Sequence, residues 1–190
     1  MNEELKPLEK RIENFIGHLR GLTREGYEDR AALAALRSGL RGEMQNAAPL
    51  NPHVVPFLEE QIRSSDRWFY VVGALFAWHP RATPKRSLGA SFKELKGQDG
   101  ASQSVEARFA ALLACDERDL HLHLRQAVGL LRAHYVAVDW RSLLRDLALY
   151  GGWNHPERKV QMHWARDYYR KPFEAPEAQS TDQTPDQSTL

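Results

Sequence analysis

Apolar residues recur at helical spacing along nearly the whole chain. The segment at about 5–23 places five of them on one face: Leu8, Ile12, Phe15, Ile16 and Leu19. At about 100° per residue, this spacing is typical of an amphipathic helix. No run of alternating apolar and polar residues and no Asn-Gly or Asp-Gly turn signal indicates a strand or hairpin. The pattern therefore predicts an all-α fold, a helical bundle of roughly eight helices in two helical halves.

The same periodicity predicts where the other helices lie. Further helices are expected at about 29–41, 57–63, 66–78, 104–114, 119–135, 140–150 and 156–170, with one helical turn at 92–96. Asp139 suits the N-cap position of the helix that follows it, and Pro156 suits the first turn of the last helix. Segment 68–78 is apolar almost all round, which predicts a helix in the centre of the bundle.

Glycine and proline mark the segments between the helices. Segment 46–56, with three prolines, is expected to be a loop or short turns, and segment 81–91, with Pro84 and Gly89, is expected to be a loop. The stretch GQDGAS at 97–102 predicts a boundary between an N-terminal helical unit, 1–97, and a C-terminal helical unit, 98–171. The acidic tail, 172–190, is rich in Pro, Gln, Ser and Thr, which predicts disorder.

The composition indicates a protein with neither a membrane span nor a disulfide framework. The longest apolar run is about half of the roughly 20 residues that cross a bilayer, and the N-terminus lacks an apolar signal region. We therefore expect a soluble, cytoplasmic protein. The single cysteine, Cys115, excludes an internal disulfide and any multi-cysteine zinc site, and its apolar helix face favours a buried small side chain.

Catalytic and metal-binding patterns are missing from the sequence. It holds no HExxH, no Gly-rich phosphate loop, no GxSxG and no kinase signature. His121 and His123 point about 200° apart on a helix, so they do not share a metal simply. Asp116, Glu117 and Asp119 cluster where a helix begins, and acids there favour the helix dipole. We expect no catalytic residue, no metal, no cofactor and no small-molecule substrate.

Arginine accounts for 19 of the 26 basic residues, and much of it recurs along single helix faces. Three trios each fall within a stripe roughly 40° wide: Arg30, Arg37 and Arg41; Arg118, Arg125 and Arg132; and Lys159, Arg166 and Arg170. No acid lies within 30–41 or 120–137. The planar, always-charged guanidinium binds phosphate, so such stripes predict contact with a nucleic-acid backbone. Ordinary solvated helix faces are the alternative.

Two further groups of residues extend the binding hypothesis. Lys85 and Arg86, beside Arg81 in a proline-bounded segment, form another basic site. Exposed rings can stack on the bases of a single strand, and the candidates by residue type are Trp68, Phe69, Trp78, Trp140, Trp153 and Trp164. Most of these lie at core periodicity, so we expect them to pack in the core. Because no helix-turn-helix, zinc-finger or RRM signature is present, the binding is expected to lack base readout.

Six collinear strings resemble one known family. They are RAALAALRSGL (30–40), WFYVVGALFAWHP (68–80), SLGASF (87–92), SVEARFAALLACDERDLHLHLRQAVGLL (104–131), VDWRSLLRDLALYGGW (138–153) and HPERKVQMHWARDYY (155–169). Together they resemble the CasB-type small subunit of the type I-E CRISPR surveillance complex, Cascade. The resemblance covers about residues 5–170, nearly all of the chain except the tail.

The resemblance implies a function that the residues alone do not. Members of that family are all-helical and non-enzymatic, and two copies assemble head-to-tail as a dimer within Cascade. Their expected partners are the large subunit, the backbone subunits, the guide RNA and the target DNA. Their basic surface stabilises the R-loop by holding the displaced non-target strand during antiviral target recognition. Sequence reading in such complexes belongs to guide–target pairing, while protein supplies backbone contacts.

The candidate nucleic-acid-binding residues come from two sources, the resemblance and the basic clusters. Basic positions of the family match, by motif context, Arg30, Arg37, Arg81, Arg86, Arg108, Arg125, Arg132, Arg141, Arg145 and Arg158. The basic clusters add Arg41 and Lys85. Arg145 and Arg158 could instead pair with Asp146 or Asp139. Two other hypotheses stay open, a structural adaptor whose arginines pair with acidic partner surfaces and an enzyme acting on nucleic acid.

Overall fold

The computed structural model describes residues 5–40, 48–98, 102–150 and 156–170, and these residues are helical without any named strand. The helices are α1 (Leu5–Leu22), α2 (Arg30–Ser38), α3 (Asn51–Val54), α4 (Asp66–Trp78), α5 (Leu88–Lys96), α6 (Ser102–Ala114), α7 (Leu120–Ala133), α8 (Trp140–Ala148) and α9 (Pro156–Tyr169). Two 3₁₀ turns, η2 (Ala48–Leu50) and η3 (Val55–Phe57), flank α3. The predicted all-α fold class is therefore confirmed, while the tail at 172–190 lies outside the described residues.

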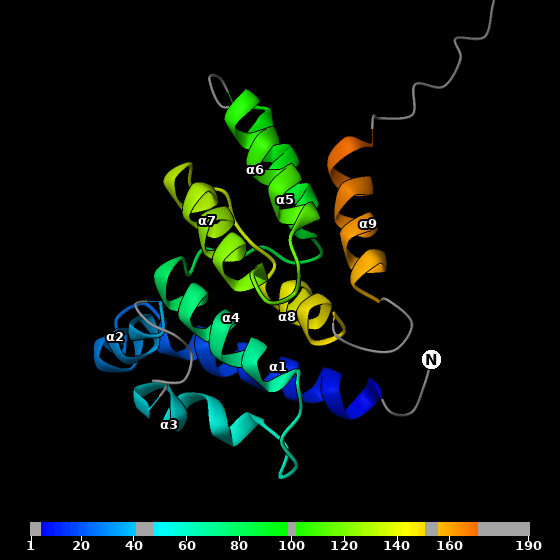
Figure 1. Ribbon diagram of the computed structural model, residues 1–190. Helices are drawn as coiled ribbons and strands as arrows, with labels where there is room; N and C mark the ends of the chain where they lie inside the picture. Colours follow the sequence, from blue (N-terminus) through cyan, green and yellow to red (C-terminus); the bar gives the residue numbers. More distant parts are fainter. Residues whose placement is uncertain (1–4, 41–47, 99–101, 151–155, 171–190) are drawn as a thin grey trace, which may run out of the picture.

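The helices form two groups joined by α7 and α8 (Figure 1). Helices α1–α4 gather at one end, where α2 packs against α4. Helices α5, α6 and α9 gather at the other end, where α5 lies along α9 and contacts α6. Helix α8 contacts both α1 and α4, and α7 contacts α4, α5 and α6. One continuous hydrophobic core runs through both groups.

Helix α4 lies at the centre of this arrangement, as its apolar sequence predicts. Trp68, Phe69, Val72 and Phe76 are all buried within it, and the helix contacts α1, α2, α3, α7 and α8. A helix that is apolar on every side can bury all of its faces only by being surrounded. The Phe76 ring packs in a T-shaped arrangement with the buried Trp140 ring of α8, with centroids 5.8 Å apart.

The helix predicted at 57–63 is wrong. Short helical turns instead occupy 48–57, in the segment expected to be a loop or short turns, and Leu58 is extended with φ −90° and ψ 164°. Prolines are tolerated here because two of them occupy first-turn positions of α3 and η3. Phe57 packs against Phe15 of α1, whereas Ile62 is 98% exposed, so the apolar residues of 57–63 do not share one buried face.

Helix α5 begins at Leu88, four residues before the predicted turn. Ser87 caps it, because its hydroxyl oxygen accepts a hydrogen bond from the Ala90 amide at 3.2 Å. Gly89, which suggested a loop, lies where α5 meets α9, and a Cβ there would come 1.9 Å from the Trp164 carbonyl oxygen. The glycine therefore serves a close helix crossing and not a turn.

Three other helix starts follow the sequence. The Asp139 side chain accepts a hydrogen bond from the Ser142 amide at 3.0 Å, which confirms Asp139 as the N-cap of α8. Asp29 caps α2 in the same way through the Ala32 amide at 2.9 Å. Helix α9 begins at Pro156, as predicted. Across the described ranges, no helix combines the length and apolarity needed to cross a membrane.

Candidate nucleic-acid interface

The candidate residues whose side chains the structure describes lie on four helices and in the segment between α4 and α5. Arg30 and Arg37 are on α2, Arg81, Lys85 and Arg86 follow α4, Arg108 is on α6, Arg125 and Arg132 are on α7, and Arg141 and Arg145 are on α8. Arg86 is half-buried and the others are exposed. Arg41 and the side chain of Arg158 lie outside the described part of the chain.

Three of these arginines already bind carboxylates of the same chain. Arg86 pairs with Glu94 of α5, while Arg141 and Arg145 share Glu9 of α1, at 3.4 Å and 4.0 Å. Arg145 therefore pairs with Glu9 and not with Asp146 or Asp139. Because exposed pairs contribute only about 0–1 kcal/mol, these arginines can exchange partners, but two carboxylates offset part of their positive charge in the free protein.

The other described candidates form no ion pair within the described residues: Arg30, Arg37, Arg81, Lys85, Arg108, Arg125 and Arg132. Arg37 donates only to the Leu33 carbonyl of its own helix, at 3.1 Å. The stripe predicted from 118 to 132 is shorter than expected, since α7 begins at Leu120 and Arg118 lies in the preceding turn. Arg125 and Arg132 remain on the exposed surface of α7.

Arg81 and Arg132, far apart in the sequence, meet in one open groove of about 490 Å³. We call it the α4–α7 groove, because it lies where α4 and α7 end. It is lined by Trp78, His79, Pro80, Arg81, Gly129, Arg132, Ala133 and Tyr135. The Arg132 guanidinium lies over the Trp78 ring, 5.3 Å from its centroid, and that of Arg81 lies over Tyr135 at 5.4 Å. None of the lining residues is acidic.

Hydrogen bonds from buried groups fix the walls of the groove. The Val138 amide donates to the Arg81 carbonyl at 3.2 Å, within an isolated parallel bridge between this segment and the chain after α7. The Trp140 indole N–H donates to the same carbonyl at 3.3 Å. His79 Nε2 donates to the Val136 carbonyl at 2.7 Å. The two walls are therefore tied together directly beneath the arginines.

His79 adds no positive charge of its own to the groove. Burial lowers the pKa of its imidazole below the ordinary 6.5, the charges of Arg132 and Arg81 lower it further, and the hydrogen bond to Val136 opposes them. The ring is 5% exposed and serves as a neutral donor beneath the two guanidinium groups. The cationic character of the groove therefore comes from Arg81 and Arg132.

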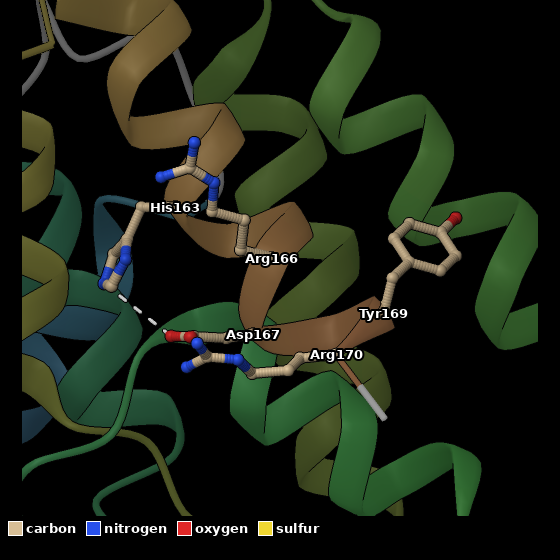
Figure 2. Close-up of a pocket in the computed structure, with 5 residues that line it drawn as sticks. All are labelled: His163, Arg166, Asp167, Tyr169 and Arg170. Atoms are coloured by element: carbon tan, nitrogen blue, oxygen red, sulfur yellow. Dashed lines mark ion pairs between the residues drawn. The ribbon is translucent and has the colours of Figure 1, made fainter. Parts of the chain in front are cut away.

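A second cationic hollow, of about 670 Å³, lies on α9 (Figure 2). It contains Arg166 and Arg170 of the third predicted stripe. Asp167 lies among them, 3.7 Å from His163 Nε2, and accepts a hydrogen bond from Ser87. Figure 2 shows Tyr169 extending to the opposite side of the helix from His163. Because a carboxylate occupies this hollow, it attracts phosphate less than the α4–α7 groove does.

The aromatic candidates divide as expected, with one exception. Trp68, Phe69, Trp140 and Trp164 are buried, which confirms core packing, and Trp153 lies outside the described residues. Trp78 is half-buried and forms part of the groove. Tyr135, which sequence reasoning missed, is 73% exposed. The sequence signal that could have indicated Tyr135 is its position at the end of the helix expected at 119–135, three residues after Arg132. A ring at such a helix end would not pack in the core.

The described residues show neither a cluster of metal ligands nor an activated cysteine thiol. No three His, Cys, Asp or Glu side chains converge there to hold a metal ion. Burial raises the pKa of the Cys115 thiol to about 11, so the thiol stays protonated near neutral pH. Its sulfur donates to the Leu112 carbonyl at 3.2 Å, as expected of a packed, unreactive cysteine.

Comparison with known proteins identifies the family. Residues 32–169 match the family model of CRISPR-associated protein Cse2. A Cse2 protein of Thermus thermophilus is 33% identical over 165 residues, which cover 83% of this chain and 89% of the relative. This chain belongs to the Cse2 family.

Solved structures of Cse2-type proteins share the fold. CasB from Thermus thermophilus matches with a TM-score of 0.69 and 34% identity, covering 83% of this chain and 97% of that one. A chain of a CRISPR RNA-guided surveillance complex matches with a TM-score of 0.72 and 28% identity, covering 85% and 93%. The resemblance to the CasB-type small subunit is therefore confirmed.

Proposed function

We propose that this Cse2-family chain is a non-catalytic small subunit of a type I-E Cascade complex. It binds nucleic-acid backbone without sequence specificity and stabilises the R-loop by holding the displaced non-target strand. Its partners are the large subunit, the backbone subunits, the guide RNA and the target DNA, and a second copy of the chain completes a dimer. The solved relative from a CRISPR RNA-guided surveillance complex, which shares 28% identity, supports this assembly.

The observation that carries the proposal is the convergence of Arg81 and Arg132 in the α4–α7 groove without an acid among its lining residues. Both guanidinium groups are exposed, and neither has an ion-pair partner in the described residues. A planar guanidinium binds phosphate through two parallel N–H donors. Two of them in one groove can bind the phosphate backbone of a strand without contacting base edges.

The energetics of target opening explain why such contacts matter. Exchanging a DNA duplex for an RNA–DNA hybrid is nearly balanced in free energy, so modest backbone contacts can decide the outcome. The displaced strand would otherwise re-anneal and expel the guide. Each phosphate that is neutralised releases counterions, so the stabilisation must weaken as salt concentration rises.

The test is fluorescence-anisotropy binding of the purified protein to a labelled single strand and a matched duplex over a salt series. We compare the parent with the double variant R81Q/R132Q. The variant should bind every sequence more weakly, and its salt dependence should be shallower by about 0.7 in log–log slope for each lost phosphate contact to a single strand. Circular dichroism should show an unchanged helix content, because both side chains are exposed.

The matched control is R141Q/R145Q, which removes the same charge from arginines that already pair with Glu9. It should change affinity and salt slope much less than R81Q/R132Q does. Equal losses in the two variants would show that only net charge matters, and parental binding by R81Q/R132Q would remove the groove from the interface.

An adaptor role is the second candidate, favoured by the pairing of Arg141 and Arg145 with Glu9. Those contacts show that Arg141 and Arg145 bind a carboxylate, the group that an acidic partner surface would offer. If the parent binds neither the single strand nor the duplex even at low salt, the arginines bind partner proteins, and the proposal that this chain holds the displaced strand fails.

A further inference from the structure

We propose that the α4–α7 groove holds one unpaired nucleotide, with its base stacked on Tyr135 and its phosphate bound by Arg81 and Arg132. This inference rests on the proposed function and adds to it a preference for single strands. In a duplex the bases stack on one another, so their faces are closed to a protein ring, whereas every base of a single strand offers a π-face.

The backbone at Tyr135 is the first observation. Tyr135 has a φ of 59°, a left-handed conformation that a residue with a Cβ seldom adopts. Its amide donates to the Arg132 carbonyl at 3.1 Å, and the Val136 amide donates to the Leu131 carbonyl at 2.9 Å. These two bonds define a Schellman motif at the end of α7, with Tyr135 at the C′ position that usually holds glycine.

The exposure of the ring is the second observation. Tyr135 is 73% exposed even though the Arg81 guanidinium lies over it. The chain therefore places a large aromatic residue where glycine would be less strained, and then leaves most of that residue in solvent. Neither helix termination nor core packing requires the ring, and a strained residue in a lined groove points to a binding role.

The arginines are already oriented for a phosphate. Arg81 lies over Tyr135 and Arg132 lies over Trp78, and guanidinium stacking on a ring leaves the in-plane N–H donors open. The Trp78 ring reaches this place because position 129 is glycine, where an added Cβ would come 2.9 Å from the end of the indole. The groove volume of about 490 Å³ lies within the range of about 300–1,000 Å³ typical of small-ligand sites.

The experiment uses the full chain, a labelled poly-thymidine single strand, the same strand with abasic sites, and a duplex. The variant Y135G removes the ring and relieves the positive φ, whereas Y135F keeps the ring. Y135G should bind the single strand about tenfold more weakly, the loss expected for one stacked base. Its salt slope and duplex binding should match the parent, because every phosphate contact remains. Y135F should bind like the parent.

Two further readouts separate stacking from a structural effect. The thermal midpoint of Y135G should be no lower than that of the parent, because glycine suits the C′ position. The parent should lose affinity for the abasic strand, whereas Y135G should bind abasic and intact strands alike, since the interaction is already absent.

The outcomes distinguish this inference from the proposed function. If Y135G binds the single strand like the parent while R81Q/R132Q binds more weakly, stacking is overturned and backbone binding stands. If the parent binds no strand at low salt, both are overturned. If Y135G loses single-strand and duplex binding equally, Tyr135 only shapes the groove, and the preference for single strands is overturned.

Discussion

His79 links the two groove arginines to the stability of the fold. Its imidazole is buried, donates to the Val136 carbonyl at 2.7 Å, and has a lowered pKa because of burial and the nearby positive charges. The unfolded chain takes up a proton at His79 as the pH falls through 6.5, whereas the folded chain, whose His79 pKa is lower, takes it up only at a lower pH. The stability that His79 contributes is therefore present above that pH and is lost as the pH falls.

Replacing His79 with glutamine should reduce this pH dependence. Glutamine keeps an N–H donor for Val136 but does not titrate, so H79Q should lose less unfolding free energy than the parent between about pH 7.5 and pH 5.5, by up to about 1.4 kcal/mol per pH unit. Urea denaturation at each pH measures the difference. Burial also lowers the pKa of His18, but that contribution is common to both proteins and cancels. If the unfolding free energies of H79Q and the parent changed equally with pH, the assignment of this pH dependence to His79 would be wrong.

Residue chemistry could be read from the sequence only in part. The acid-free stretch at 120–137 pointed to Arg132, and the basic, proline-bounded segment with Lys85 and Arg86 pointed to Arg81. The sequence does not show that Tyr135 adopts a positive φ, because the Schellman geometry forms only when α7 ends there. It also does not show that Glu9 would neutralise Arg141 and Arg145, since that pairing depends on α1 lying against α8.

At the scale of helices, α5 and α9 lie side by side and pack closely against each other (Figure 1). A Cβ at Gly89 would lie 1.9 Å from the Trp164 carbonyl oxygen, and this atom belongs to helix backbone that cannot rotate away. We expect G89A to separate the two helices and to lower the free energy of unfolding by at least about 3 kcal/mol, at the upper end of overpacking effects. Urea denaturation with far-UV circular dichroism measures it.

Gly17 on α1 supplies the matched control. Nothing lies within 4 Å of a Cβ built at that helical position. G17A should therefore raise stability by up to about 1 kcal/mol, the helix-propensity difference between alanine and glycine. A G89A protein as stable as G17A would mean that α9 does not rest on α5.

The sequence predicted the helices whose signals lie within the helix itself, and it missed the elements that depend on distant partners. Helices α1, α4, α7 and α8 were expected close to their observed positions because each carries its own apolar face or cap. The start of α5 was missed because Gly89 is needed by α9, which lies far along the chain. The helix expected at 57–63 failed for a related reason, since Phe57 is held by α1 while Ile62 faces solvent.

At the scale of the whole molecule, the predicted units 1–97 and 98–171 share one core. Buried residues of α1, α4, α5, α7, α8 and α9 belong to a single hydrophobic cluster. Helix α5 precedes the predicted boundary, yet it lies with α6 and α9, and α8 follows that boundary, yet it contacts α1 and α4. The boundary at 97 stays a prediction about chain organisation, but its two sides depend on each other for burial.

This shared core predicts cooperative unfolding. Leu36 of α2 and Leu143 of α8 are both buried, at 0% and 2% exposure, on opposite sides of the boundary. L36A and L143A should each destabilise the whole protein by about 2–5 kcal/mol, and each should lower one common thermal midpoint by roughly 2–4 °C per kcal/mol. Helix content by circular dichroism and tryptophan fluorescence should follow the same transition in both variants. If a variant shifted only part of the circular-dichroism or fluorescence transition, the group of helices that carries the substitution would unfold independently of the other group. The contacts of α8 with α1 and α4 would then be too weak to couple the two groups of helices.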